Sequence, residues 1–147
     1  MRAVKRSALV AQSSERLFAL INDIEAYPRF VPWCTSARVE SRTETEIVAT
    51  LGVRRGPLKT EFTTRNTLIP FSRVRLELVR GPFRELSGEW RLTPIGALTG
   101  AQGTKIELEL RFAFANSISA LVFEPLFGET AASLVDAFVA RARDPAV

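Results

Sequence analysis

The chain has 147 residues, and we expect one domain over residues 1–147 because that length suffices for a substantial apolar core. Its 46% of hydrophobic and 24% of charged residues are ordinary for a globular protein and exclude a disordered or fibrous chain. Lys and Arg outnumber Asp and Glu by 20 to 16, which favours contact with nucleic acid or anionic lipid, while a basic surface that faces only water explains the excess equally well.

The N-terminal segment lacks the pattern of a signal peptide, because Lys5 and Arg6 fall where the apolar core of such a peptide would be. The longest uncharged run, residues 112–123, is shorter than the roughly 20 apolar residues of a membrane-spanning helix. Cys34 is the only cysteine, so an internal disulfide is excluded. We therefore expect a cytoplasmic protein with no transmembrane segment. Peripheral contact with a membrane remains an alternative.

The first predicted elements are a strand over residues 4–10 and an amphipathic helix. Ser13 can cap this helix, and Glu15 is favourably placed in its first turn. Apolar side chains spaced i, i+3, i+4 and i+7 form one stripe, Leu17, Leu20, Ile21 and Ile24.

The segment YPRFVPWC, residues 27–34, holds three large aromatic side chains, two prolines and the cysteine. Pro28 and Pro32 push the residues before them toward extended or turn geometry, which excludes a regular helix or strand. We expect irregular backbone or short helical turns that are held in place by packing.

Six further strands are predicted, because the apolar period changes to two after Thr35. Their approximate ranges are 36–42, 46–53, 59–68, 73–79, 85–93 and 104–114. The last is the clearest, with apolar residues on one face and charged residues on the other. The short connections indicate antiparallel pairing, and Gly88 predicts a bulge or bend in the strand that holds it.

A long C-terminal helix is predicted from Asn116 or Ser117 onward, and Pro125 should kink or restart it in its first half. The fold class is therefore α+β, with a strongly curved antiparallel sheet and one long apolar helix across its concave face. A cavity remains between them if they do not close completely.

Catalytic and metal-binding motifs are missing from the sequence. There is no histidine, the commonest general base and metal ligand. Cys34 has no activating neighbour in the sequence, so we interpret it as a small buried side chain. Glu107 and Glu109 lie between Lys105 and Arg111 on one strand face, which favours a ladder of opposite charges over an acid–base pair. We expect no enzyme, no cofactor and no metal site.

Glycine-containing segments do not form a phosphate-binding loop either. GVRRGP and GALTGAQG match neither nucleotide-binding spacing, and we interpret both as turns. The first belongs to the densest basic cluster, and we expect an anion-binding or ribosome-binding surface if the basic residues are contiguous in space, or a solvated hairpin if they are not. These residues are Arg54, Arg55, Lys59, Arg80 and Arg84.

Aromatic residues come from both helices, from YPRFVPWC and from the inward faces of several strands, so they should converge on one interior. Most such residues are core, but apolar ligand pockets are built from the same side chains. We expect a cavity or its lip to be formed by Phe18, Tyr27, Phe30, Val31, Trp33, Phe62, Leu76, Phe83, Trp90, Phe112, Phe127 and Phe138. The alternative is a core that plugs itself and binds no ligand.

Several segments resemble the START-type coenzyme Q-binding family (polyketide cyclase/dehydrase superfamily), and within it the bacterial ribosome-association toxin (RatA) branch. The similar segments are SSERLFALINDIEAYPRFVPWC, LKTEFTTRNTL, LVRGPFRELSGEWRLTPI and LVDAFVARA. The resemblance implies a helix-grip (SRPBCC) fold, a seven-stranded antiparallel sheet that grips the C-terminal helix around a hydrophobic cavity. Pro125 departs from the uninterrupted helix that the family would have.

The resemblance implies two non-enzymatic functions. The first, which we place ahead, is binding of ubiquinone or another polyisoprenoid lipid in the cavity, in support of respiration. The second is binding of the large ribosomal subunit through its rRNA, which blocks association of the subunits. An enzyme of the cyclase or hydrolase kind, suggested only by the cavity and by polar residues such as Asn66 and Glu89, is ranked last because a fold does not transfer an activity.

Overall fold

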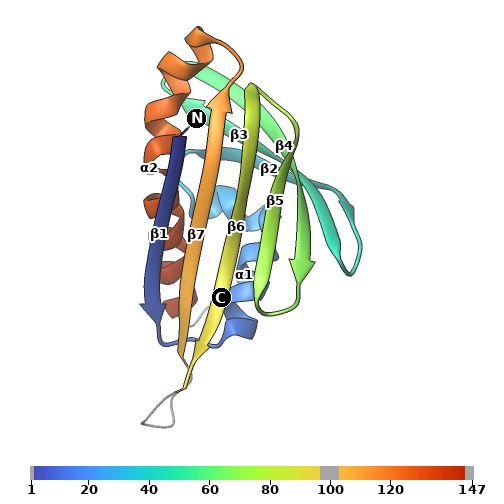
Figure 1. Cartoon of the computed structure of the whole chain (residues 1–147), viewed down its shortest axis with the longest axis vertical. Coiled ribbons are helices and arrows are strands. Elements are labelled where there is room, and N and C mark those ends of the chain that lie inside the picture. Colours follow the sequence, from blue (N-terminus) through green and yellow to red (C-terminus); the bar gives the residue numbers. More distant parts are fainter. Residues whose placement is uncertain (1, 97–102, 145–147) are drawn as a thin grey trace.

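A twisted antiparallel sheet of seven strands packs one face against a long C-terminal helix in the computed structural model, which describes residues 2–96 and 103–144 (Figure 1). The elements in chain order are β1 (Arg2–Val10), α1 (Ser14–Asn22), the 3₁₀ helix η1 (Ile24–Arg29), β2 (Cys34–Arg42), β3 (Glu46–Arg55), β4 (Leu58–Ile69), β5 (Arg73–Arg80), β6 (Phe83–Ile95), β7 (Gly103–Phe114) and α2 (Ser117–Arg143). The sequence predicted this order and these strands correctly.

The strand order is β1-β7-β6-β5-β4-β3-β2, so consecutive strands from β2 to β7 are neighbours and β1 closes the far edge. Because every pair is antiparallel, β3, β5 and β7 finish at one end of the sheet, where β2, β4 and β6 begin. α2 starts at that same end, directly after β7 (Figure 1). The segment GALTGAQG contains residues 97–102, which lie outside the described part of the chain.

The first helix begins as the sequence predicted, with the Ser13 hydroxyl accepting a hydrogen bond from the backbone N–H of Arg16 at 3.2 Å. It ends at Asn22, and Ile24 then opens η1, so the predicted apolar stripe is divided between two helices. Pro28 lies inside η1, which is the short helical turn expected at the start of YPRFVPWC. Tight turns and packing therefore hold this segment, because the prolines prevent a longer helix.

Alternation along the strands separates a buried face from an exposed one. On β7 the predicted inward residues Ile106, Leu108, Leu110, Phe112 and Phe114 are all buried. These side chains and those of α1, η1 and α2 form one continuous core.

Gly88 is not a bulge, contrary to our prediction. It pairs in register with Leu76 and Leu110, while the register shifts lie elsewhere in β2, β4 and β6. A Cβ at Gly88 would lie 2.6 Å from Cδ2 of Leu110 and 2.7 Å from the carbonyl oxygen of Glu109. Close approach of β7 is a reason for glycine at this position.

The long helix α2 is capped by Asn116, whose Oδ1 accepts a hydrogen bond from the backbone N–H of Ser119 at 2.8 Å. Its halves, Ser117–Glu129 and Ala132–Arg143, are bent by 41°. Pro125 lies in the first half, about one turn before the bend. Among the described residues no single straight helix is long and apolar enough to cross a membrane, and only the two bent halves taken together meet those criteria.

Candidate functional site

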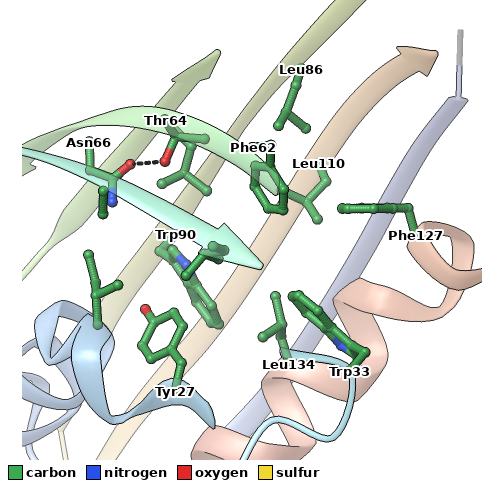
Figure 2. A pocket seen from close by; sticks show the side chains of 14 residues that line it. Tyr27, Trp33, Phe62, Thr64, Asn66, Leu86, Trp90, Leu110, Phe127 and Leu134 are labelled. Carbon is green, nitrogen blue, oxygen red and sulfur yellow. Dashed lines mark hydrogen bonds between the residues drawn. The ribbon is translucent and has the colours of Figure 1, made fainter. Parts of the chain in front are cut away.

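A small cavity lies between the inner face of the sheet, η1 and α2 (Figure 2). Its volume is about 70 Å³. The wall is formed by Ile24, Tyr27, Trp33, Ala49, Leu51, Phe62, Thr64, Asn66, Leu86, Leu76, Trp90, Leu110, Phe127 and Leu134. All but five of these side chains are purely hydrocarbon, so the cavity offers mainly apolar contact.

Half of the residues predicted for the cavity line it, namely Tyr27, Trp33, Phe62, Leu76, Trp90 and Phe127. The other half do not, namely Phe18, Phe30, Val31, Phe83, Phe112 and Phe138. The aromatic residues do converge on one interior, as expected. Together they form a packed core that encloses only a small cavity.

The residues outside the wall have ordinary packing roles. Phe138 is fully buried, with its ring centroid 5.3 Å from that of Tyr27 and 5.2 Å from that of Trp90. Phe30 is covered by the guanidinium of Arg141, 4.5 Å above its ring.

Val31 and Phe112 are only 1% exposed, and both belong to the core. Phe83 stacks on Phe114, with 4.7 Å between ring centroids. Phe18, on α1, contacts Phe71 with 5.7 Å between centroids.

Eight wall residues were not predicted: Ile24, Ala49, Leu51, Thr64, Asn66, Leu86, Leu110 and Leu134. The alternation of inward and outward side chains along each strand could have predicted the wall residues that lie on strands. Thr64 and Asn66 follow Phe62 by two and four positions on β4, which places them on the same face.

Few polar atoms reach the cavity. Thr64 Oγ1 donates a hydrogen bond to Asn66 Oδ1 at 2.7 Å (Figure 2). The Tyr27 hydroxyl donates to the backbone carbonyl oxygen of Ile21, and burial, above all, raises the pKa of this phenol far beyond its ordinary range. The buried Nε1 of Trp33 has no hydrogen-bond partner in the described chain.

The volume limits what this conformation can hold. An apolar cavity of about 150 Å³ is the size that accommodates benzene in a well-studied case. The cavity here measures about 70 Å³, so a benzoquinone ring would have to displace wall side chains such as Trp33 or Phe127.

Cys34 is buried next to the cavity wall, and its Sγ donates to the backbone carbonyl oxygen of Ser36 at 3.3 Å. Burial raises the pKa of this thiol from 9.0 to about 11. The group is therefore a neutral thiol at physiological pH, which agrees with a packing role and not with that of a nucleophile.

The outer face of the sheet carries the predicted ladder of opposite charges. Glu107 lies 4.0 Å from both Lys5 and Lys105, and Arg111 lies 3.0 Å from Glu109. The hydrogen bond from Arg111 lowers the pKa of Glu109. Both carboxylates are thus paired with cations, as in a structural ladder.

Asn66 and Glu89, the polar residues considered for catalysis, lie on opposite faces of the sheet. Asn66 lines the cavity, whereas Glu89 pairs with Arg73 at 2.7 Å and with Arg91 at 4.0 Å on the outer face. No group of three or more metal-ligating side chains occurs in residues 2–96 and 103–144.

The predicted basic residues gather at one end of the sheet, which we call the basic end. It consists of the finishing residues of β3 and β5 and the first residues of β4 and β6, and it holds Arg54, Arg55, Lys59, Arg80 and Arg84. The backbones of Arg54 and Lys59 are paired across β3 and β4. Of Arg55 only the backbone, which pairs with Leu58, is described.

The basic residues differ in how free their charges are. Arg54, Lys59 and Arg84 are exposed and have no carboxylate partner within the described residues. Arg80, by contrast, forms an ion pair with Glu40. Of the four side chains in this set that the structure describes, three are therefore cations available to a partner.

Exposed apolar side chains lie at the same end. Leu58 is 48% exposed, and Ile118 and Leu121, on the first turns of α2, are 78% and 81% exposed. Apolar side chains bordered by free cations are typical of a surface that contacts another macromolecule.

Comparison with known proteins assigns the chain to a family. Residues 10–139 match the family model described as "Polyketide cyclase / dehydrase and lipid transport". The chain is 39% identical over 140 residues to "Ribosome association toxin RatA" of Pseudomonas aeruginosa, covering 95% of this chain and 94% of that protein. It is 27% identical to "Coenzyme Q-binding protein COQ10, mitochondrial" of Drosophila melanogaster, covering 94% of this chain but 57% of that protein.

Solved structures show the same fold. A START superfamily protein from Mycobacterium smegmatis superposes with a TM-score of 0.77 at 20% identity, over 95% of this chain and 96% of that one. The α+β helix-grip fold expected from the resemblance is thereby confirmed. The chain belongs to the polyketide cyclase / dehydrase and lipid transport family.

Proposed function

We propose that this protein binds the large ribosomal subunit through the basic end and prevents it from joining the small subunit. This reading was our second choice from the sequence, and two considerations move it to first. The full-length similarity is stronger to a ribosome association toxin than to a coenzyme Q-binding protein. The cavity is also too small, as it stands, for a quinone ring.

The observation that carries the proposal is the gathering of basic strand ends. Arg54, Lys59 and Arg84 come from three strands but lie at one end of the sheet, without carboxylate partners. Free guanidinium and ammonium groups bind RNA phosphates and release counterions. The site of action would be the compartment that holds ribosomes, which in a bacterium is the cytoplasm.

Sedimentation with purified ribosomal subunits tests the proposal. The protein should sediment with large subunits and not with small ones, and it should reduce the yield of joined ribosomes in a sucrose gradient. The double variant Arg54→Glu/Lys59→Glu should lose most of this binding, because it reverses two of the three free cations described at the basic end.

A matched control reverses two exposed cations at the other end of the molecule, Arg75 on β5 and Arg143 in the last turn of α2. The variant Arg75→Glu/Arg143→Glu has the same change in net charge, so it should retain binding. Equal losses in the two variants would mean that only net charge matters, and the proposed surface would be wrong.

Binding of an apolar molecule in the cavity is a second function that we propose, and the two are compatible because one uses the interior and the other the surface. The mainly hydrocarbon wall supports it, as does the family's description. Native mass spectrometry of gently purified protein, followed by extraction, should detect ubiquinone or another isoprenoid at one molecule per chain, with wall side chains such as Trp33 or Phe127 displaced to admit it. A folded protein without any bound molecule would count against this function.

We propose that neither function involves catalysis. The two polar residues considered as catalytic lie on opposite faces of the sheet, and the thiol of Cys34 is protonated at neutral pH. Turnover of a substrate that is abolished by changing Asn66 would contradict this.

A further inference from the structure

We propose that the basic end, together with the first turns of α2, is a docking surface for an anionic lipid bilayer. The inference goes beyond ribosome binding, because it assigns a second partner to this end of the molecule. It also assigns a role to exposed apolar side chains of α2 that contact with RNA phosphates does not require. The cavity takes no part in it.

The first half of α2 is apolar on two sides. Its inward side chains Phe123 and Phe127 are buried in the core. Its outward side chains Ile118 and Leu121 are 78% and 81% exposed, and the exposed Pro125 continues their face with a spacing of i, i+3 and i+7. A helix that is apolar all round is normally covered on every side. The outward face of this half therefore has the character of a surface that an apolar partner covers.

These turns of the helix lie beside the strand hairpins of the basic end (Figure 1). The backbone N–H of Ala115, just before α2, donates to the carbonyl oxygen of Pro82 in the β5–β6 hairpin at 2.8 Å. Gly81 of the same hairpin packs on β4, since a Cβ there would lie 2.7 Å from Cβ of Phe62. Leu58, the first residue of β4, is 48% exposed. Helix and hairpins thus present apolar side chains at the same end of the molecule.

The charges at this end favour an anionic partner. Arg54, Lys59 and Arg84 are exposed and have no carboxylate partner within the described residues. Glu85 is an exposed carboxylate beside Arg84, so the free cations outnumber it. Cations that border exposed apolar side chains are the usual composition of a protein surface that binds anionic lipid.

A bilayer matches these groups better than RNA does. Guanidinium and ammonium groups bind lipid phosphates at the level of the headgroups, while aliphatic side chains enter the hydrocarbon below them. Residues 117–123 carry no charge, so the first turns of α2 can enter the headgroup region without burying one. Glu124, which follows, is paired with Arg2 at 3.9 Å. RNA offers phosphates but no hydrocarbon, so the outward side chains of α2 distinguish the two partners.

Flotation of the full chain with lipid vesicles tests the inference. Vesicles made of equal parts of phosphatidylglycerol and phosphatidylcholine should carry the protein upward in a density gradient. Vesicles of phosphatidylcholine alone should bind it at least about tenfold more weakly, because each cation near an anionic surface contributes roughly a factor of five in affinity. Added salt should weaken binding to the anionic vesicles by screening these charges.

The variant Ile118→Gln/Leu121→Gln removes the apolar contact but retains the net charge and good helix formers. It should bind anionic vesicles about tenfold more weakly or worse, because two aliphatic side chains no longer enter the hydrocarbon. Its binding to large ribosomal subunits should be unchanged. The matched control is Leu9→Gln/Ile95→Gln, which removes side chains that are 70% and 40% exposed at the opposite end of the sheet. This control should bind vesicles like the unmodified protein.

Circular dichroism verifies that both variants are folded. Equal losses of vesicle binding in the two folded variants would overturn the inference, as would failure of the unmodified protein to float with anionic vesicles. Loss of ribosome binding in Ile118→Gln/Leu121→Gln would also overturn it, because the apolar turns would then serve the ribosome. Vesicle binding without any binding to ribosomal subunits would support the inference and contradict the proposed ribosome function, so the two failures are distinguishable.

Discussion

The backbone amide of Arg54 donates a hydrogen bond to the backbone carbonyl oxygen of Trp33, with 3.1 Å between the nitrogen and the oxygen. Trp33 lines the cavity, and Arg54 is one of the free cations of the basic end. The cavity and the surface that we propose for the ribosome are therefore joined by a direct backbone contact.

Replacing Trp33 with alanine should destabilise the protein by about 3–5 kcal/mol, the range for truncation of a buried aromatic side chain. The ring is 8% exposed and packs against Phe127, with 6.2 Å between centroids. Urea denaturation followed by circular dichroism measures the change. Trp33→Phe retains most of the packing and should cost much less. Equal costs would show that a phenyl ring restores none of the packing and would contradict this expectation.

Neutralising Arg54 and Lys59 should weaken the dependence of ribosome binding on salt. Log affinity falls as log salt concentration rises, and each phosphate contact that is lost reduces the steepness of this fall by about 1. Arg54→Gln/Lys59→Gln should therefore reduce the steepness by about 2. Sedimentation at several potassium concentrations measures the slope. A slope identical to that of the unmodified protein would exclude these two side chains from phosphate contact.

Alkaline pH should destabilise the protein through Cys34. The unfolded chain releases the thiol proton near pH 9.0, but the folded chain holds it until about pH 11. The free energy of unfolding is therefore unaffected by this group below pH 9 and falls as pH rises from about 9 toward 11. Urea midpoints across this range should decline less steeply in Cys34→Ala, and parallel curves for the two proteins would contradict the raised pKa. The buried Tyr27 phenol acts in the same direction above pH 10.

Gly88→Ala should destabilise the sheet by about 1–3 kcal/mol, the usual cost of overpacking. The added methyl group would lie within 2.7 Å of the backbone carbonyl oxygen of Glu109, which cannot move without shifting β7. Gly96→Ala is the control, because a Cβ there meets nothing within 4 Å. Equal urea midpoints for the two variants would mean that the strands can separate at little cost.

The sequence was sufficient to predict the strands because each has one buried and one exposed face. Inward residues of β7 alternate with charged ones, and this alternation does not depend on how the individual side chains pack. The basic end also follows from the sequence, because short hairpins force alternate strand ends to meet. Arg54 and Arg84, 30 positions apart by their numbers, lie at the same end of the sheet for this reason.

The cavity could be predicted only in part, because alternation says which side chains point inward but not which of them meet empty space. Leu110 and Phe112 are neighbours on the inward face of β7, yet the first lines the cavity and the second is packed solid. The difference depends on where η1 and α2 lie against the sheet. The apolar period of a sequence does not give the positions of these helices. It also does not give the volume of the cavity, which is too small for a quinone ring in this conformation.

Tyr27, Trp33 and Trp90 have a consequence that concerns optical spectroscopy. They are the single tyrosine and both tryptophans of the chain, and all three line the cavity. Absorbance and fluorescence beyond the phenylalanine bands therefore arise entirely from the cavity wall. Any change in near-ultraviolet signal at constant fold reports on the cavity, so the unmodified protein carries its own optical probe of occupancy.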